Sequence, residues 1–227
     1  MSLAARAAPF LLIAILALAS AGRRRPLLFA VTKPGATLAL LLVVGVPRGR
    51  YALMTAIGLV LSALGDAALL DESERRFLAG VFLFFCAHLA YVIAFAFPSG
   101  AEPASTHWIL AILATTAIAL ATTTLLAKLW PTIEPSLKIP VLAYGAVITI
   151  MCAAAFRLTA APLPRAAVAF AALGAVLFYS SDGVLAWSRF RAEFRGAERL
   201  NLTLYWSGQL GLSLAASLVD QAIVVSG

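Results

Sequence analysis

The sequence has 227 residues, of which 63% are hydrophobic and 12% are charged. Soluble domains average about 45–50% apolar and about 25% charged residues, so this chain has too few polar residues to cover one apolar core. The composition excludes disordered, collagen-like, coiled-coil and disulfide-scaffold proteins. The net charge of +7 comes from cations between apolar segments, where they orient a membrane protein and do not indicate nucleic-acid binding. The sequence therefore predicts a polytopic helical membrane protein.

Eight apolar segments follow one another, each near the roughly 20 residues that cross a bilayer as a helix. Short connectors that carry proline, glycine and charge separate them, so nothing remains for a soluble domain. We expect an all-α fold with a single domain over residues 1–227, a bundle of eight transmembrane helices. In chain order the expected spans are residues 3–21, 26–46, 51–70, 77–97, 107–127, 137–156, 166–187 and 202–225.

The first segment also has features of a cleavable signal peptide. Arg6 precedes its apolar run, and Ala19, Ser20 and Ala21 form an A-x-A-like cleavage site. Three arginines follow at once at positions 23–25, and such charge resists translocation. We expect the segment to be retained; its cleavage would leave seven spans.

Basic residues are distributed unevenly between the two sides of the membrane. With eight spans, the odd-numbered connectors carry eleven lysines and arginines, and the other side carries five. By the positive-inside rule the first side is cytoplasmic, which places both termini outside. Because arginine outnumbers lysine and alanine is abundant, as in GC-rich bacteria, we expect a bacterial plasma membrane, with an endoplasmic-reticulum homologue as the alternative.

Ionisable residues lie inside the predicted spans, where each costs several kcal/mol and so indicates a functional site. At 1.5 Å per residue, Lys33, Asp66 and Asp182 lie within about 6–11 Å of the cytoplasmic face. Tyr144 and Gln209 lie at the same depth on two further spans. Five polar groups from five helices at one level predict a polar pocket that opens toward the cytoplasm.

His88 lies eleven residues into the fourth span and is expected to form the floor of this pocket, with Tyr91 one turn deeper. Asp220 lies near the opposite face, outside the expected site. Structural explanations stay open for the others: snorkelling of Lys33 to lipid headgroups, pairing of Asp66 with Arg75 or Arg76, a backbone hydrogen bond from Ser62, packing of His88, and interfacial positions for Tyr144 and Tyr205.

The third and seventh spans share a pattern. Gly58 precedes Asp66 by eight residues, and Gly174 precedes Asp182 by the same distance. The two spans run in the same direction, four spans apart. This is typical of a parallel four-plus-four repeat, with one aspartate from each half facing the centre.

A set of short motifs runs through most of the chain, from about residue 26 to residue 220. Its members are Lys33, Pro34, Gly58, Leu59, Ser62, Gly65, Asp66, Gly80, Phe84, His88, Tyr91, Phe178, Ser181, Asp182, Tyr205 and Gln209. In order and spacing these residues resemble the YhhN/TMEM86 family of eight-span membrane proteins.

The resemblance implies a lysoplasmalogenase, which hydrolyses the vinyl-ether bond of lysoplasmalogens to a fatty aldehyde and a glycerophospho-alcohol. It implies that Asp66 and Asp182 are the catalytic carboxylates. The expected partners are the lysophospholipid substrate and membrane lipids, with no cofactor. The expected substrate-binding residues are Lys33, Ser62, His88, Tyr91, Tyr144, Tyr205 and Gln209.

Two carboxylates suit this chemistry. Protonation of the alkenyl carbon gives an oxocarbenium ion, water attacks it, and the hemiacetal collapses to the aldehyde. One aspartate would be the protonated acid, and the other would stabilise the cation and activate water. Which aspartate is the acid stays open. Lys33 would bind the substrate phosphate or keep an aspartate ionised.

The same residues also suggest other functions. Catalytic zinc normally takes three protein ligands, and the chain has two histidines, one of them, His107, near the opposite face, so no metal is expected. A small-solute or proton-coupled transporter is the alternative function, because intramembrane Asp, Lys and His within a parallel repeat suit one. The clustering of polar groups near one face argues against it. A lipid-binding or scaffolding role is the third candidate.

Overall fold

The computed structural model describes residues 3–21, 26–71, 73–96 and 105–226. All regular structure in these ranges is helical, which confirms the all-α prediction. The elements are α1 (Leu3–Ser20), α2 (Pro26–Ala39), α3 (Leu41–Val44), α4 (Arg50–Ala68), α5 (Glu74–Ala96), α6 (Ser105–Leu129), η1 (Trp130–Thr132), α7 (Pro135–Arg157), η2 (Leu158–Ala160), α8 (Arg165–Phe190) and α9 (Ala197–Ser226).

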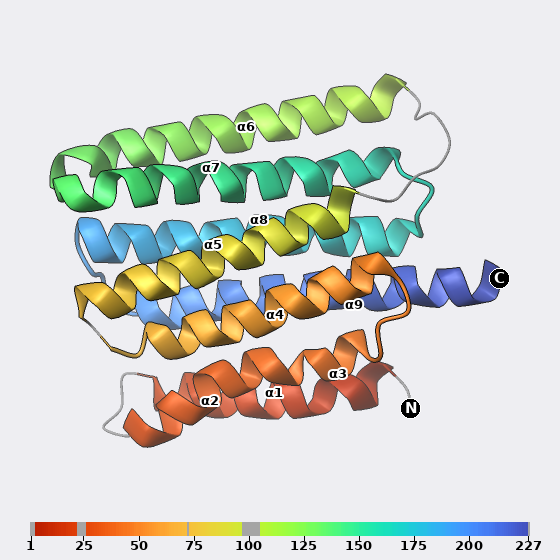
Figure 1. Cartoon of the computed structure of the whole chain (residues 1–227), viewed down its shortest axis with the longest axis horizontal. Coiled ribbons are helices and arrows are strands. Elements are labelled where there is room, and N and C mark those ends of the chain that lie inside the picture. Colours follow the sequence, from red (N-terminus) through yellow and green to blue (C-terminus); the bar gives the residue numbers. More distant parts are fainter. Residues whose placement is uncertain (1–2, 22–25, 72, 97–104, 227) are drawn as a thin grey trace.

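In the described part of the chain the helices form eight rods that lie side by side, with α2 and α3 together making one rod (Figure 1). The start of α1 and the end of α9 lie at the same end of the bundle. The turns from α4 to α5, from α6 to α7 and from α8 to α9 lie at the other end, which we call the turn end. The arginines at 23–25, expected on the cytoplasmic side, lie outside the described residues.

Within the described residues, seven helices are long and apolar enough to cross a membrane. They cover seven of the eight predicted spans, and α9 is the exception. The side chains of residues 224–226, at the end of α9, lie outside the described residues. Along the described part of α9 polar side chains recur and are buried inside the bundle: Tyr205, Gln209, Ser213, Ser217 and Asp220.

The predicted span 26–46 is one rod but not one continuous helix. The N–H of Leu40 donates to the carbonyl of Thr37 at 3.2 Å, and the N–H of Val43 donates to that of Leu40 at 2.9 Å. These are bonds between residues three apart, the pattern of a 3₁₀ turn. The turn separates α2, which carries Lys33, from α3.

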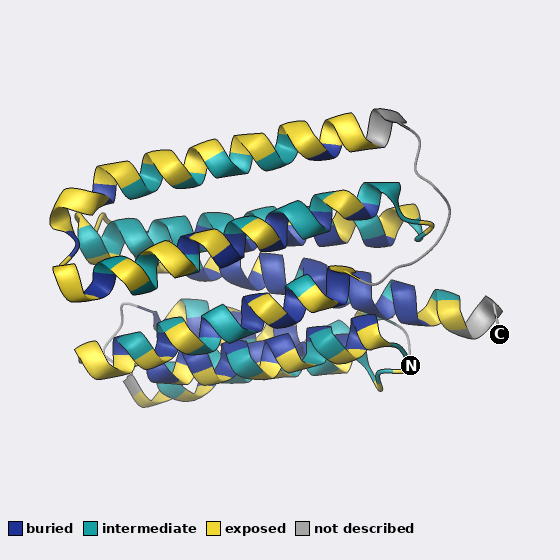
Figure 2. Ribbon diagram, turned by 45° about the horizontal axis from the view of Figure 1, so that its top comes forward, coloured by how far each residue is buried: buried dark blue, intermediate teal, exposed yellow. Residues whose placement is uncertain are grey.

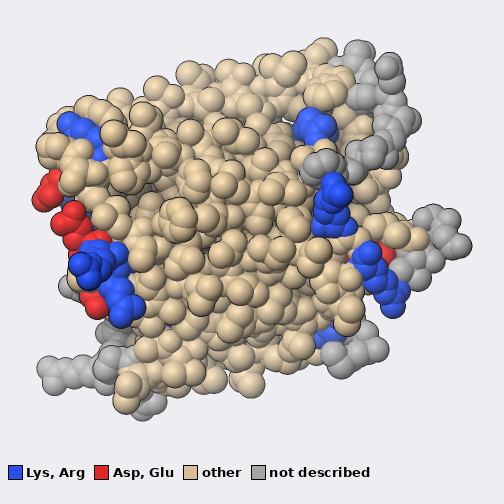
Figure 3. All heavy atoms as spheres, in the orientation of Figure 1, with Lys and Arg blue, Asp and Glu red and all other residues tan. Residues whose placement is uncertain are grey.

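The surface is apolar around the middle of the bundle and charged at its ends. Side chains of α6 are mostly exposed, although they include large apolar residues such as Ile112, Leu113 and Leu120 (Figure 2). Lysine, arginine, aspartate and glutamate gather at the two ends, with a wide uncharged band between them (Figure 3). Exposed apolar helices between charged ends are the surface of a protein that spans a membrane.

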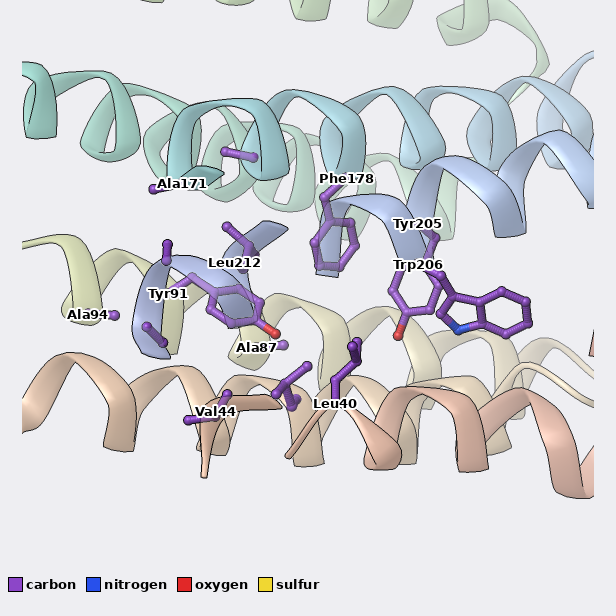
Figure 4. Packing of buried hydrophobic residues seen from close by; sticks show 14 of the residues in the cluster. Leu40, Val44, Ala87, Tyr91, Ala94, Ala171, Phe178, Tyr205, Trp206 and Leu212 are labelled. Carbon is purple, nitrogen blue, oxygen red and sulfur yellow. The ribbon is translucent and has the colours of Figure 1, made fainter. Parts of the chain in front are cut away.

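Helices α8 and α9 pack backbone to backbone. A Cβ atom at Gly208 would lie 2.7 Å from the backbone nitrogen of Phe178 and 2.8 Å from the carbonyl oxygen of Gly174. Only glycine permits so close an approach, as at other tight contacts between membrane helices. Phe178 projects from this contact into the interior, where its ring centroid lies 5.2 Å from that of Tyr205 and 6.3 Å from that of Tyr91 (Figure 4).

The glycines of the proposed repeat both lie at close helix contacts, but the contacts differ in kind. A Cβ at Gly58 would clash with the ring of Tyr91, whereas one at Gly174 would lie 2.8 Å from the carbonyl oxygen of Gly208. The four-plus-four repeat stays a prediction.

Candidate functional site

A polar cavity of about 230 Å³ lies at the turn end of the bundle. Asp66 from α4 and Asp182 from α8 both line it. Lys33 from α2 and Tyr205 from α9 complete the set of predicted site residues in its wall. Further charged side chains line it: Asp71, Arg189, Glu193 and Glu198. Four helices therefore bring the carboxylates of Asp66 and Asp182, one ammonium group and one tyrosine hydroxyl to a single cavity.

Hydroxyl groups surround the carboxylate of Asp66, which is 2% exposed. Thr37 Oγ1 donates to Asp66 Oδ2 at 2.7 Å, and the Tyr205 hydroxyl donates to the same oxygen at 2.9 Å. Trp206 Nε1 in turn donates to Thr37 Oγ1 at 3.3 Å. Lys33 lies one turn before Thr37 on α2 and interacts electrostatically with Asp66. The partners of Asp66 are thus these groups and not an arginine at the start of α5.

The carboxylate of Asp182 has a histidine and a tyrosine as partners. The Tyr144 hydroxyl donates to Asp182 Oδ2 at 2.7 Å, and His88 Nε2 lies 3.2 Å from the same oxygen and 3.0 Å from the tyrosine hydroxyl. His88 is fully buried, with Nδ1 3.3 Å from Met151 Sδ and its ring against Phe178. The hydroxyls of Tyr144 and Tyr205 therefore point to the aspartates inside the bundle. The two tyrosines do not have the interfacial positions that were the structural alternative for them.

Three of the predicted site residues lie deeper and line neither this cavity nor the apolar one described next. The Tyr91 hydroxyl donates to Gln209 Oε1 at 2.7 Å. Gln209 Nε2 and Ser62 Oγ are buried, and Ser62 Oγ makes no hydrogen bond to its own backbone, which was one of the structural explanations open for it. These residues lie a turn or more farther from the turn end than Asp66 and Tyr205, where aromatic rings fill the interior. His88 likewise lies behind Asp182 and does not form a floor of the cavity.

A second cavity, of about 100 Å³, lies between α5, α6, α7 and α8. Its walls are almost entirely apolar, with leucines of α6 opposite Gly145 and Gly183. Asp182 lines both cavities, whereas Asp66 lines only the polar one. Asp182 therefore stands where a polar compartment meets an apolar one.

Sequence reasoning missed several groups in this site. Thr37 is the clearest case, and its position four residues after Lys33 on one helix face was the available signal. Asn201 Nδ2 donates to the carbonyl of Ser181 at 2.6 Å and so holds the backbone beside Asp182. The guanidinium of Arg189 lies 4.6 Å from the ring centroid of Phe77 at the cavity wall.

At the opposite end of the bundle Asp220 has a different environment. Its carboxylate accepts hydrogen bonds from the backbone N–H of Gly49 at 2.7 Å and of Arg48 at 3.0 Å. These bonds join the end of α9 to the start of α4. Asp220 thus lies apart from the polar cavity, and the side chain of His107 lies outside the described residues.

The fold and the site together define a polytopic helical membrane protein with Asp66 and Asp182 in one cavity at one end of the bundle. The YhhN family model matches residues 28–216, and the chain belongs to this family. The family resemblance of the sequence motifs is therefore confirmed.

Relatives of the chain carry a functional name. The chain is 34% identical over 170 residues to the lysoplasmalogenase TMEM86B of Homo sapiens, which covers 75% of this chain and 66% of that protein. It is 29% identical over 199 residues to the lysoplasmalogenase homolog of Dictyostelium discoideum, which covers 74% of this chain and 64% of that protein. The chain thus spans slightly less than two thirds of the length of these relatives. No solved structure matches the chain.

Proposed function

We propose that the protein is a lysoplasmalogenase, a hydrolase that cleaves the vinyl-ether bond of choline or ethanolamine lysoplasmalogens to a fatty aldehyde and a glycerophospho-alcohol. The observation that carries the proposal is the pair Asp66 and Asp182 in one polar cavity that adjoins an apolar one. The names of the relatives support the same activity.

The two cavities fit the two parts of such a substrate. The apolar cavity between α5, α6, α7 and α8 suits the hydrocarbon chain, which enters from the surrounding lipid. The polar cavity suits the glycerophosphate headgroup, with Lys33 and Arg189 available to its phosphate. The scissile bond of the substrate joins these two parts, so it lies beside the carboxylates.

The carboxylates supply acid/base catalysis without a cofactor. One protonates the alkenyl carbon, and the other stabilises the oxocarbenium ion and activates water. Thr37, Tyr205, Tyr144 and His88 hold the carboxylate groups in place through the hydrogen bonds described above. Because the Asp66 carboxylate is buried, its interactions are stronger there than they would be in water.

The location of the protein is also part of this proposal. All eight rods, α9 included, would cross the plasma membrane of a bacterium as one domain, with both termini outside and the turn end in the cytoplasm. The shared end of α1 and α9 supports an even number of crossings (Figure 1). Basic residues on the three described turns of the turn end support its cytoplasmic side: Arg75, Arg76, Lys128, Lys138, Arg189, Arg191, Arg195 and Arg199.

The test is aldehyde release by detergent-purified protein from an alkenyl lysophosphatidylcholine, with the acyl ester of equal chain length as the control substrate. We expect Asp66→Asn and Asp182→Asn each to lower kcat by about 10²–10⁴-fold, the usual contribution of a general acid or base. Asp220→Asn is the matched control, because that aspartate contacts only the far end of the bundle. Near-wild-type turnover in both site variants would contradict the acid/base mechanism.

A transporter is the second candidate, and the buried polar side chains along α9 favour it. They extend beyond the polar cavity into the other half of the bundle, as a conduction path requires. Ser213 Oγ, however, donates to the carbonyl of Gln209 in its own helix, as membrane serines commonly do. Protein that folds but releases no aldehyde, and that moves protons or solute in vesicles, would favour this candidate.

A further inference from the structure

The two carboxylates of the site are not equivalent in position. Asp182 lies at the boundary of the polar and apolar cavities, and Asp66 lies in the polar cavity alone. In a lysoplasmalogen the vinyl ether joins the hydrocarbon chain to the glycerol. The carbon that must accept a proton lies on the chain side of the ether oxygen. With the chain in the apolar cavity, that carbon lies beside Asp182.

The close partners of Asp182 lie on one side of its carboxylate. His88 Nε2 lies 3.2 Å from Asp182 Oδ2, within hydrogen-bond distance. His88 is fully buried and lines neither cavity, so Asp182 is the member of this pair that contacts the substrate. Both close partners contact Oδ2, and the nearest polar contact of Oδ1 is Ser181 Oγ at 3.5 Å. Oδ1 is therefore the oxygen that is open to the substrate.

Asp66 is placed to act on water. Two hydroxyls donate to its Oδ2 and hold that oxygen, and the ammonium group of Lys33 lines the same cavity wall. Asp66 also faces the compartment that opens at the membrane surface, from which water arrives.

We propose that Asp182 is the general acid and Asp66 the general base, an assignment that rests on the proposed vinyl-ether hydrolysis. Asp182 transfers its proton to the alkenyl carbon, whose double-bond electrons form the new C–H bond and leave an oxocarbenium ion. The Asp66 carboxylate takes one proton from water as the water oxygen bonds to the cationic carbon, which gives a hemiacetal.

The second half of the reaction restores both groups. The Asp182 carboxylate takes the hydroxyl proton of the hemiacetal, the carbon–oxygen bond to glycerol breaks, and Asp66 gives its proton to the departing glycerol oxygen. One water is consumed, one aldehyde and one glycerophospho-alcohol are formed, and each aspartate ends in its starting state.

The test uses azide as a small nucleophile that needs no base. In Asp66→Ala the acid is intact, so azide in the vacated space traps the oxocarbenium ion and raises substrate consumption at least about tenfold, with an azido-ether adduct seen by mass spectrometry. In Asp182→Ala no oxocarbenium ion forms, so azide has no effect. Azide rescue of Asp182→Ala, of both variants or of neither would overturn the assignment.

A second measurement covers the case in which an alanine variant does not fold. In Asp66→Asn water attack becomes limiting, so the solvent deuterium isotope effect on kcat is smaller than in Asp182→Asn, where carbon protonation limits the rate. The reverse order would overturn the assignment. Wild-type protein is the reference in both experiments: absence of aldehyde there would refute the proposed function itself, whereas aldehyde with a reversed pattern would refute only the assignment.

Discussion

Each carboxylate of the site is held by side chains from other helices. The Oδ2 atom of Asp66 accepts two hydroxyl hydrogen bonds, from Thr37 and Tyr205, and that of Asp182 accepts one from Tyr144. A hydrogen bond contributes about 0.5–1.5 kcal/mol, and about 1.5–3 kcal/mol where one partner is charged, as proposed for Asp66. The hydroxyls therefore set where the carboxylate oxygens point, and the catalytic proposal depends on that direction.

Thr37→Val tests this dependence with almost no change in shape. The variant removes the donor to Asp66 Oδ2, so we expect kcat to fall about 10–100-fold, as loss of a charge-assisted hydrogen bond implies. Thr32→Val is the matched control on the same helix, because the Thr32 hydroxyl donates to its own backbone at Leu28. Steady-state aldehyde release measures both variants. Equal kcat in the two would show that the Thr37 hydroxyl has no part in catalysis.

At the scale of elements, the contact between α8 and α9 sets the distance between the two sides of the site. Asp182 lies on α8 and Tyr205 on α9, and the contact of Gly208 with Gly174 lies nearby. Because backbone meets backbone there, neither helix has a flexible side chain that could yield.

Gly208→Ala would force the two helices apart. The added methyl group would lie within 3 Å of backbone atoms of α8, and overpacking of this kind costs about 1–3 kcal/mol. We expect a lower melting temperature in detergent and lower turnover per folded molecule. Gly35→Ala is the control, because its Cβ would have one neighbour at 3.9 Å, and there alanine stabilises a helix by about 0.5–1 kcal/mol. A Gly208→Ala protein as stable as wild type would contradict this packing.

At the scale of the whole molecule, the two ends of the bundle have separate roles. The turn end carries the polar cavity, and at the other end the Asp220 carboxylate joins α9 to the start of α4 through the N–H groups of Arg48 and Gly49. A carboxylate with backbone donors stabilises the connection between elements without reaching the site.

Asp220→Ala is expected to separate stability from activity. Its loss leaves two backbone donors without their acceptor, at a cost of about 1–3 kcal/mol. Thermal unfolding should shift down by several degrees, while kcat and KM of the folded protein stay within about twofold of wild type. A large fall in kcat with unchanged stability would instead link Asp220 to catalysis across the bundle.

The sequence by itself determined the class of protein, the family, seven candidate spans and the placement of Lys33, Asp66 and Asp182 toward the same end of the bundle. Composition and the rise per residue of a helix act along the chain, so these properties need no knowledge of helix neighbours. The sequence determines the eighth span only in part. The polar residues of α9 are compatible with a membrane only when the other helices bury them.

Only the tertiary structure decided which groups meet. Asp66 bonds to residues 29 and 139 positions away in the chain, and His88 lies against an aspartate 94 positions away. Such pairs depend on how each helix is rotated about its axis and which helices are neighbours, and an almost uniformly apolar span carries little information about either. Helix rotation also explains why Thr37 contacts Asp66 although the sequence did not predict it as a site residue. It likewise explains why Ser62, Tyr91 and Gln209 do not line the polar cavity. The boundary position of Asp182 likewise exists only because four helices enclose an apolar cavity beside a polar one.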